Sequence, residues 1–515
     1  MRLGVLKFFI YLSLVFSCFS FHSPLFAKAF NGTMMQYFEW NLPDDGKLWD
    51  KISSETKHLA QLGITALWLP PAFKQASSNS VGYGPYDLYD LGEFEQKGCI
   101  RTKYGTKDQY LAAINSAHLN NIQVYADIVL NHRMGADSTE WVDAVRIARD
   151  NRNNQYGQST KIRAWTVFDF LGRQKKYSDF TWRWSHFNGV DWDDQNHEGS
   201  IFKFATKNWD WEVDSEFGNY DFLMGADLDM DSLEVQQELK NWGLWYLNFT
   251  QVDGFRIDAI KHIKFDVISA WINYLRKESK KELFTVGEYW SHDVNKLKNF
   301  LAKTSEVMSL FDAPLHYNFY AASKAGGYYD MGAILNNTLM KEMPIYAVTL
   351  VDNHDTQPGQ ALESYVETWF KTIAYAFILT REEGYPCVFY GDYYGINKNN
   401  IAGLSSQIDY LLRARKYYAF GPQHSYLDHH DIVGWTREGE EEHKNSGLAT
   451  LVSDGPGGSK NMYVGLKHKG KIFYDYTKNR DDKVIINNMG FGEFKVNGGS
   501  VSVWVAEEDL KSNKI

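Results

Sequence analysis

Asp258, Glu288 and Asp355 each stand at or just after the end of a short run of apolar and β-branched residues. Arg256 stands two positions before Asp258, and because side chains alternate along a strand, both should point to the same face. Paired carboxyl groups in different protonation states can cleave a glycosidic bond. The ionised group attacks or stabilises the oxocarbenium-like carbon, and the protonated group delivers a proton to the leaving oxygen.

The neighbours of these acids favour different protonation states. Arg256 predicts that Asp258 stays ionised, whereas Tyr289 and Trp290 beside Glu288 predict a raised pKa for that carboxyl group. Any one of the acids alone is better explained as an ordinary strand-end group in a surface ion pair. Three acids at the ends of three strands, with an arginine beside the first, favour a convergent catalytic site.

Eight strand-like runs alternate with helical patterns along the chain. Intervening segments such as 53–62 and 107–119 carry apolar residues at spacings of three and four, which is typical of helices. The alternation predicts a closed (β/α)8 TIM barrel of the α/β class, whose catalytic side chains come from the carboxyl ends of the strands. The predicted strands are 34–40, 64–70, 123–132, 252–259, 283–290, 309–316, 346–355 and 386–392.

The barrel pattern is interrupted after its third strand and stops near residue 420. A structureless loop as long as 132–231 is improbable in a compact domain, so this segment predicts an inserted domain. Short alternating strands separated by turn residues then predict an antiparallel β-sandwich over 421–506. The barrel itself is expected over 30–131 and 232–420, followed at the end by a tail at 507–515.

Residues 1–29 have the layout of a secretory signal peptide, with basic residues, an apolar run and a small-residue cleavage pattern ending at Ala29. The apolar run is shorter than the roughly 20 residues that a membrane span needs. Only Cys99 and Cys387 follow it, so no disulfide framework is expected. The net charge of −10 argues against nucleic acid or an anionic membrane as partner and suits a neutral substrate or bound cations. We expect a secreted monomer.

Four short stretches at the predicted strand ends form a recognisable set. They are DIVLNH at 127–132, GFRIDAIKH at 254–262, Glu288, and VDNHD at 351–355. Their order and positions resemble the α-amylase superfamily of glycoside hydrolases, and closely the liquefying bacterial α-amylases. The similarity runs from Asn31 to Trp504, nearly the whole chain.

This resemblance implies a secreted, endo-acting enzyme that hydrolyses α-1,4 bonds of starch or glycogen with retention of configuration. It implies that Asp258 is the nucleophile, Glu288 the general acid/base and Asp355 the group that grips the sugar hydroxyls. Retention in turn implies that the carboxyl groups of Asp258 and Glu288 lie about 5–5.5 Å apart. The further residues implied to touch the sugar or to orient the nucleophile are Tyr83, His132, Arg256, Lys261, Trp290 and His354.

Calcium prefers several oxygen ligands, and the inserted segment is rich in aspartate. The resemblance implies one Ca²⁺ that fastens the inserted domain to the barrel, and a linked cluster of further ions. Asn188 stands where liquefying relatives carry an aspartate, which removes one negative charge from that cluster. The implied ligands of the first ion are Asn131, Asp221, Asp227 and the backbone carbonyl of His262. The ligands that would extend the cluster are Asp210, Asp229 and Asp231. A separate calcium is expected between barrel and C-terminal domain at Gly327, Tyr329, His430, Asp431 and Asp454.

An EF-hand offers another explanation for part of these acids. Residues 227–238 nearly fit its loop, but Ser232 occupies the position that demands glycine. Asp231 with Glu234 also predicts a capping box that opens a helix over 233–247. A helix there excludes the geometry of an EF-hand loop.

Three other functions share some of these features. A relative that releases a defined short maltooligosaccharide, or favours transglycosylation, would carry the same motifs and differ in its subsite contacts. A catalytically silent starch-binding protein on this scaffold would not need three convergent acids. A metal-dependent barrel isomerase would need His and carboxylate ligands at the barrel mouth, whereas the sequence places its candidate ligands at the edge of the inserted domain.

Overall fold

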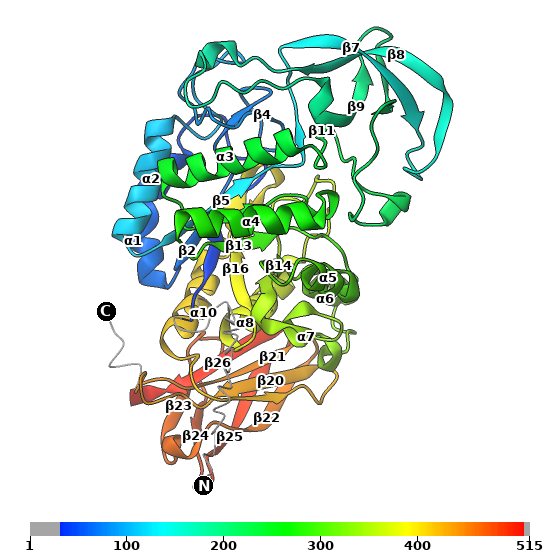
Figure 1. Cartoon of the computed structure of the whole chain (residues 1–515). Coiled ribbons are helices and arrows are strands. Elements are labelled where there is room, and N and C mark those ends of the chain that lie inside the picture. Colours follow the sequence, from blue (N-terminus) through cyan, green and yellow to red (C-terminus); the bar gives the residue numbers. More distant parts are fainter. Residues whose placement is uncertain (1–30, 509–515) are drawn as a thin grey trace, which may run out of the picture.

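The computed structural model describes residues 31–508, so the predicted signal peptide and residues 509–515 of the predicted tail lie outside the described residues. Three units follow one another along the molecule: the inserted sheet at one end, the barrel in the middle and the C-terminal sheets at the other end (Figure 1). Within residues 31–508, no helix has the length and apolar character to cross a membrane.

Eight parallel strands close into a barrel in the order β1-β16-β15-β14-β13-β12-β5-β2. Each overlaps one of the eight predicted ranges, so the predicted (β/α)8 fold is confirmed. Most strands are shorter than predicted, because the polar residues that follow them belong to loops. The strands are β1 (Met34–Gln36), β2 (Ala66–Leu69), β5 (Gln123–Ile128), β12 (Gly254–Ile257), β13 (Phe284–Gly287), β14 (Ser309–Phe311), β15 (Ala347–Leu350) and β16 (Tyr385–Phe389).

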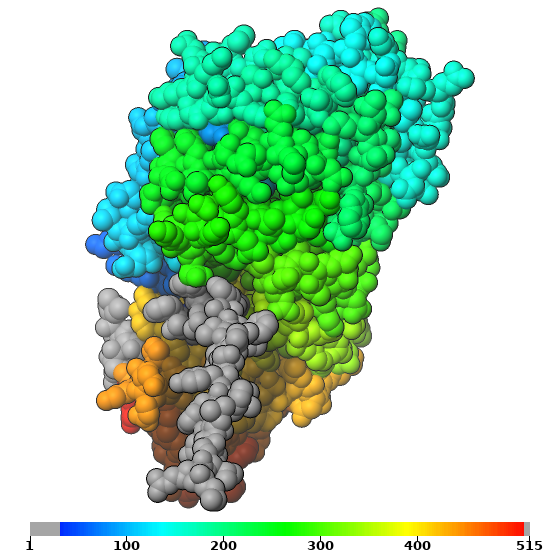
Figure 2. Space-filling view, viewed as in Figure 1, coloured from blue at the N-terminus to red at the C-terminus, as the bar shows by residue number. Residues whose placement is uncertain are grey.

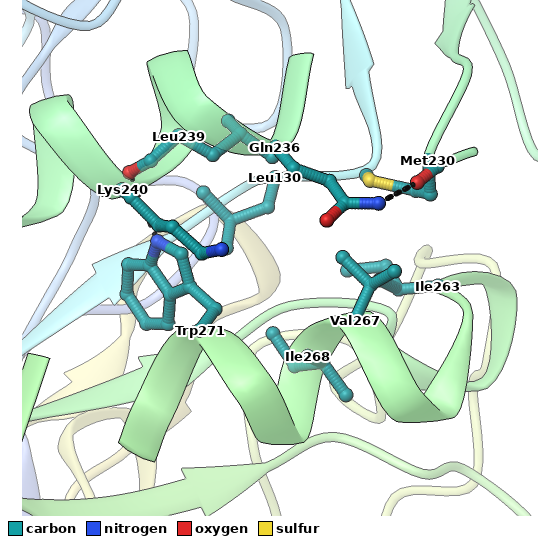
Figure 3. Close-up of a pocket in the computed structure, with 9 residues that line it drawn as sticks. All are labelled: Leu130, Met230, Gln236, Leu239, Lys240, Ile263, Val267, Ile268 and Trp271. Carbon is teal, nitrogen blue, oxygen red and sulfur yellow. Dashed lines mark hydrogen bonds between the residues drawn. The ribbon is translucent and has the colours of Figure 1, made fainter. Parts of the chain in front are cut away.

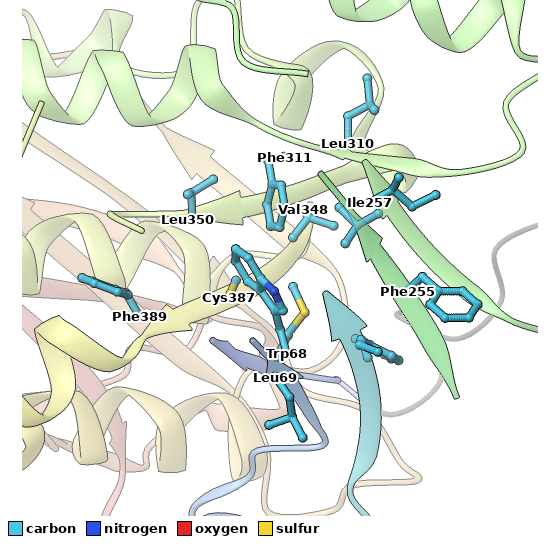
Figure 4. Packing of buried hydrophobic residues seen from close by; sticks show 14 of the residues in the cluster. Trp68, Leu69, Phe255, Ile257, Leu310, Phe311, Val348, Leu350, Cys387 and Phe389 are labelled. Atoms are coloured by element: carbon cyan, nitrogen blue, oxygen red, sulfur yellow. The ribbon is translucent and has the colours of Figure 1, made fainter. Parts of the chain in front are cut away.

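Side chains alternate between the barrel interior and the surrounding helices. Trp68 from β2 and Phe311 from β14 turn toward each other inside the barrel, with ring centroids 5.1 Å apart (Figure 4). Phe255 of β12 points the other way and packs against Trp271 of α4 (Phe265–Ser279). The next residue of β12, Arg256, therefore points inward, above an apolar barrel floor.

Helices cover the outside of the barrel. Between α3 and α4, the indole N–H of Trp271 donates to the carbonyl oxygen of Leu239 at 2.9 Å. A small, mostly apolar cavity lies between these two helices, and none of the three convergent acids lines it (Figure 3). The helices are α1 (Leu48–Leu62), α2 (Lys107–Leu119), α3 (Leu233–Thr250), α4 (Phe265–Ser279), α5 (Val294–Lys303), α6 (Ala313–Ala325), α7 (Leu339–Glu342), α8 (Thr368–Thr380), α9 (Tyr390–Tyr394) and α10 (Ser405–Tyr417).

The start of α3 corrects one prediction. Ser232 is the N-cap, and its hydroxyl accepts a hydrogen bond from the N–H of Val235 at 3.5 Å. The predicted cap at Asp231 is wrong by one residue, because the carboxylate of Asp231 binds Nζ of Lys264 at 2.5 Å instead. Since α3 begins within residues 227–238, this segment does not form an EF-hand loop.

The inserted domain is a six-stranded antiparallel sheet in the order β6-β11-β9-β10-β7-β8. It begins with β6 (His132–Arg133), so the predicted third strand, 123–132, is too long: β5 ends at Ile128. In the space-filling view the inserted domain lies directly against the helices of the barrel (Figure 2). Its other strands are β7 (Ser138–Ile147), β8 (Gln155–Val167), β9 (Phe187–Asp193), β10 (Glu198–Phe204) and β11 (Ala226–Leu228).

The C-terminal unit consists of two antiparallel sheets with a separate hydrophobic core that includes Phe494 and Trp504. One sheet has the order β19-β20-β21-β26-β23-β24, and β22 pairs with β25 in the other. The predicted antiparallel β domain is therefore confirmed. The strands are β19 (Gln423–Tyr426), β20 (Ile432–Arg437), β21 (Leu448–Ser453), β22 (Gly457–Tyr463), β23 (Ile472–Asp475), β24 (Lys483–Ile485), β25 (Phe491–Asn497) and β26 (Ser500–Ala506).

Candidate active site

The side chain of Arg256 lies at the centre of an acidic site at the carboxyl ends of the barrel strands. It is fully buried, and its Nη1 atom donates to Oδ1 of Asp127 at 2.8 Å and to Oδ1 of Asp258 at 2.7 Å. Its Nη2 atom forms an ion pair with Oε2 of Glu288 at 3.0 Å. These groups meet because β5, β12 and β13 are neighbours in the barrel. One guanidinium group thus joins three carboxylates.

The backbone fixes where the side chains of Asp258 and Glu288 begin. The N–H of Asp258 donates to the carbonyl of Ile128, and the N–H of Glu288 to that of Ile257, both at 2.9 Å. Ala259 then adopts a left-handed conformation with φ of 51°, and its N–H donates to Oε2 of Glu288 at 3.0 Å. A non-glycine residue in this conformation is strained, and such strain is concentrated at functional sites.

The pKa values of the three acids are all raised. Burial raises the pKa of Asp258 to about 6, although Arg256 opposes the shift. Loss of water outweighs the cation in setting the direction of this shift, but a pKa of about 6 still leaves Asp258 largely ionised at neutral pH, so its predicted ionised state stays a prediction. Burial also raises the pKa of Glu288, as predicted, and the pKa of Asp355 lies well above its usual value because burial and Glu288 both oppose its charge. These acids compete for protons, which allows one of them to stay protonated near neutral pH.

His354 and Asp355 lie in the loop after β15. Nε2 of His354 is 3.2 Å from Oδ2 of Asp355, and the N–H of Asp355 donates to Oδ1 of Asn353 at 2.8 Å. The amide of Gln36 donates to Nδ1 of His354 at 3.0 Å, which places the imidazole proton on Nε2. Burial, with Arg256 adding, lowers the pKa of His354 well below its usual value. The loop therefore presents a neutral N–H donor beside a carboxylate.

Tyr83, between β3 (Lys74–Gln75) and β4 (Pro85–Asp87), lies over the same barrel mouth. Its hydroxyl donates to Oδ2 of Asp127 at 2.9 Å, and its ring stacks on that of His354 with centroids 5.0 Å apart. Nε2 of His132 donates to the carbonyl oxygen of Tyr83 at 3.0 Å. Trp40, which is not among the predicted site residues, stacks on the ring of Tyr83, with ring centroids 5.9 Å apart.

Lys261 and Trp290 stand together where the inserted domain meets the loop after β13. Nζ of Lys261 donates to Oε2 of Glu216 at 3.0 Å and lies 3.5 Å from the carbonyl oxygen of Trp290. The indole N–H of Trp290 donates to the hydroxyl of Tyr317 at 3.0 Å. Both predicted contact residues are therefore held in place by side chains from other segments, Glu216 of the inserted domain and Tyr317 of α6.

Asp127 has a role that was not predicted from its motif. It lies opposite Arg256 in the register of β5 and β12, and the indole N–H of Trp68 donates to its Oδ2 atom at 3.0 Å. A signal was present in the sequence, because an aspartate inside an otherwise apolar central strand requires a buried cation or donor.

A second acidic group lies where the inserted sheet meets the barrel. The amide of Asn131 donates to Oδ1 of Asp227, and that of Asn188 to Oδ2 of Asp221, both at 3.2 Å. Burial and repulsion by neighbouring aspartates raise the pKa values of Asp221 and Asp227 well above the usual range. Oδ2 of Asp227 and Oδ1 of Asn188 have no hydrogen-bond partner among residues 31–508. Buried carboxylates that repel one another and retain unpaired oxygens fit a divalent cation.

Of the three acids predicted to extend this group, only Asp210 joins it directly: its N–H donates to Oδ2 of Asp221 at 2.8 Å. Burial raises the pKa of Asp210 to about 7. Asp229 is paired with Nζ of Lys207 at 2.5 Å, and Asp231 with Lys264 as described above. The carboxylates of Asp229 and Asp231 are thus already paired with lysine ammonium groups.

His262 lies beside the same group, and its Nδ1 atom donates to the carbonyl oxygen of Tyr220 at 2.6 Å. Across residues 31–508, no three His, Cys, Asp or Glu side chains form a complete metal-ligand set by themselves. Any ion here would therefore also need amide or backbone oxygens, which calcium accepts readily.

The residues predicted for a separate calcium site come together between the barrel and the C-terminal sheets. Both carboxyl oxygens of Asp454 lack a hydrogen-bond partner among the described residues. Burial, with Asp431 adding and the backbone of Tyr329 opposing, raises the pKa of Asp454 to about 6. Nδ1 of His430 is 2.6 Å from Oδ1 of Asp431. Gly327 has φ of 94°, and a Cβ atom there would lie 2.8 Å from the carbonyl oxygen of Asp454.

Two family models match the chain. The model of the α-amylase catalytic domain matches residues 26–409, and that of the α-amylase C-terminal domain matches residues 449–505. The first match alone spans more than half of the sequence and contains all three convergent acids.

Individual relatives agree with these matches. The chain is 63% identical over 488 residues to an α-amylase of Geobacillus stearothermophilus, covering 94% of this chain and 89% of that protein. It is 57% identical over 478 residues to a glucan 1,4-α-maltohexaosidase of Bacillus sp. (strain 707), covering 92% of each. The solved structure of an α-amylase from Malbranchea cinnamomea shares the fold, with a TM-score of 0.63 at 14% identity over 95% of this chain and 98% of that chain. The chain therefore belongs to the α-amylase family of glycoside hydrolases.

Proposed function

We propose that this protein is a secreted α-amylase that cleaves internal α-1,4 bonds of starch or glycogen by double displacement. The observation that carries the proposal is the guanidinium group of Arg256, which binds the carboxylates of Asp258 and Glu288 through its two terminal nitrogens. Two acids held by one planar group are close together, as a retaining mechanism requires.

In the first step, ionised Asp258 attacks the anomeric carbon while protonated Glu288 gives its proton to the leaving glycosidic oxygen. The bond to the leaving chain breaks, and a covalent glycosyl ester forms on Asp258. In the second step, Glu288 takes a proton from water, which attacks the same carbon and releases Asp258. The raised pKa of Glu288 supports its role as proton donor.

The other site residues bind and orient the sugar. Arg256 orients Asp258, and Asp355 with the neutral His354 binds hydroxyl groups of the sugar that is attacked. Tyr83 provides a stacking face for that sugar, and His132 hydrogen-bonds to it. Lys261 and Trp290 contact the leaving side of the chain.

The experiment that tests this proposal measures the viscosity and the reducing ends of a soluble starch solution together. We expect viscosity to collapse while few reducing ends have formed, because internal cleavage shortens long chains first. A slow loss of viscosity with one dominant short product would favour the maltooligosaccharide-forming alternative, which the maltohexaosidase relative keeps open. Absence of new reducing ends would support the silent starch-binding alternative.

We further propose that calcium binds the acidic group between inserted domain and barrel, through Asn131, Asp221, Asp227 and the backbone carbonyl of His262. A bound calcium ion would neutralise the buried carboxylates and hold the two domains together. Asp210 is close enough to contribute, whereas Asp229 and Asp231 would first have to leave their lysine partners. The group around Asp454 is proposed as a separate calcium site.

Removal of calcium is expected to lower both the melting temperature and the activity. An ion present at a thousandfold excess over its dissociation constant stabilises a folded protein by about 4 kcal/mol. Calorimetry and starch hydrolysis after treatment with a chelator measure the two effects, and Ca²⁺ but not Mg²⁺ should restore them. The variant Asp227→Asn should lose most of this response. An unchanged melting temperature after chelation would contradict the calcium sites.

The protein is also proposed to act outside the cell as a monomer on a neutral polysaccharide. The charged N-terminus and apolar run that precede Ala29 support secretion. The acidic net charge supports the absence of nucleic-acid or membrane partners after signal cleavage.

A further inference from the structure

Asp214 belongs to the inserted domain but contacts the segments that follow both catalytic strands. It is 4% exposed. Its N–H donates to the carbonyl oxygen of Lys261 at 2.9 Å, three residues after Asp258. Its carboxylate accepts a hydrogen bond from the hydroxyl of Tyr289, the residue after Glu288. One side chain and its peptide group thus connect the two segments that carry the nucleophile and the acid.

Lys296 completes this contact from the first turn of α5. Its Nζ atom lies 3.1 Å and 3.2 Å from the two carboxyl oxygens of Asp214. Asp214 therefore binds both ends of the loop that connects β13 to α5. Burial alone would raise the pKa of Asp214, but the hydroxyl of Tyr289, the N–H of Glu216 and Lys296 together lower it. The carboxylate is ionised, and both of its oxygens have partners.

The placement of Glu288 depends on the loop that begins with it. On the barrel side its backbone is bonded to Ile257, as described, and its carbonyl oxygen accepts a hydrogen bond from the N–H of Ile260 at 3.2 Å. On the other side, Tyr289 is 4% exposed and is fixed through its hydroxyl by Asp214. A proton donor acts only within about 3 Å of the leaving oxygen, and a misplacement of about 1 Å can lower the rate a hundredfold.

We propose that Asp214 is a positioning residue that acts through Tyr289 to place Glu288 for protonation of the leaving group. The inserted domain then contributes to catalysis through a defined contact. This inference rests on the proposed role of Glu288 as general acid.

The test compares substrates whose leaving groups differ in their need for a proton. When starch or a maltooligosaccharide is cleaved, the leaving group is a sugar hydroxyl oxygen that needs a proton from the acid. A maltotriosyl fluoride instead releases fluoride, which needs little help from a proton donor. Asp214→Asn and Tyr289→Phe are each expected to lower kcat on maltooligosaccharides about tenfold, a part of what a general acid contributes. With the fluoride, kcat should stay within about twofold of wild type, because protonation matters little there. KM should stay nearly unchanged on both substrates.

A matched control removes a similar contact elsewhere. The hydroxyl of Tyr393 donates to Oδ1 of Asp409 at 2.7 Å on the outside of the barrel, so Asp409→Asn removes the charge from a tyrosine–aspartate hydrogen bond remote from Glu288. It should leave the ratio of the two rates unchanged. The double variant Asp214→Asn with Tyr289→Phe should be no slower than the slower single variant, because both changes weaken the same contact.

Equal losses on both substrates, or no loss on either, would overturn the role of Asp214. The variant Glu288→Gln separates this failure from failure of the proposed function. If Glu288→Gln shows a large loss on maltooligosaccharides and a small one on the fluoride while Asp214→Asn does not, only the inference about Asp214 is wrong. If Glu288→Gln also loses similar activity on maltooligosaccharides and on the fluoride, the assignment of the general acid is wrong.

Discussion

Asp258→Asn is expected to lower turnover of starch by roughly 10⁴-fold or more, the scale lost when a catalytic nucleophile is removed. The amide fills the same space but cannot form the glycosyl ester. Stability should not fall. Because the pKa of Asp258 is raised to about 6 in the folded protein, its charge destabilises the fold at pH values above that pKa, and the effect disappears in more acidic solution. Removing the charge should therefore leave the melting temperature at pH 7 equal or higher.

Initial-rate assays and calorimetry at pH 7 measure the two effects of this substitution. Asp475→Asn is a suitable control, since Asp475 is also a buried aspartate whose pKa is raised by burial but lies in the C-terminal sheets. It should retain turnover. Comparable turnover in Asp258→Asn would place the nucleophile elsewhere.

Arg256→Met is expected to be the most damaging single substitution for stability. It would leave Asp127, Asp258 and Glu288 buried without their common cation, and loss of one partner from a buried ion pair costs about 3–5 kcal/mol. Since Arg256 lowers the pKa of Asp258, its removal should raise that pKa further. Asp258 must be ionised to attack, so the acidic limb of the activity profile should move to higher pH.

Denaturant unfolding measures the expected loss of stability, and the pH dependence of kcat/KM measures the expected shift of the acidic limb. Asp127→Asn added to Arg256→Met should restore some of the stability, because one unpaired charge is removed. Arg415→Met is the control: Arg415 is also buried, but it binds carbonyl oxygens, including that of Gly32 at 3.1 Å. It should lower stability without moving the pH profile. A profile that stays in place in Arg256→Met would contradict the assigned coupling.

The fold was largely predictable because strand and helix periodicities are local properties of the sequence. The residues that close each strand were also predictable, since polar groups after apolar runs mark the barrel mouth. The end of β5 was not, because Val129 and Leu130 continue the apolar run beyond Ile128, although His132 already pairs within the inserted sheet. The cap of α3 was misplaced by one residue because Asp231 and Ser232 are both good caps, and only the contact with Lys264 decides between them.

The electrostatics of the site were less predictable, because they depend on burial and on partners distant in sequence. Arg256 next to Asp258 predicts an ionised carboxylate, whereas the raised pKa of Asp258 follows from the depth of the site, which the local sequence does not reveal. The pairing of Asp229 with Lys207 was equally unpredictable, since nothing in the local sequence distinguishes a metal-binding aspartate from an aspartate in an ion pair. Asp127 was overlooked because its partner lies on another strand.

The two ends of the inserted domain lie side by side. β6 and β11 pair through His132 with Asp227 and Arg133 with Ala226, so the chain leaves the barrel and returns to it at nearly the same point. A segment attached in this way can be exchanged during evolution, or in a recombinant chimera, without altering the spacing of the barrel strands. A replacement segment would still need a contact equivalent to that of Asp214 with Tyr289.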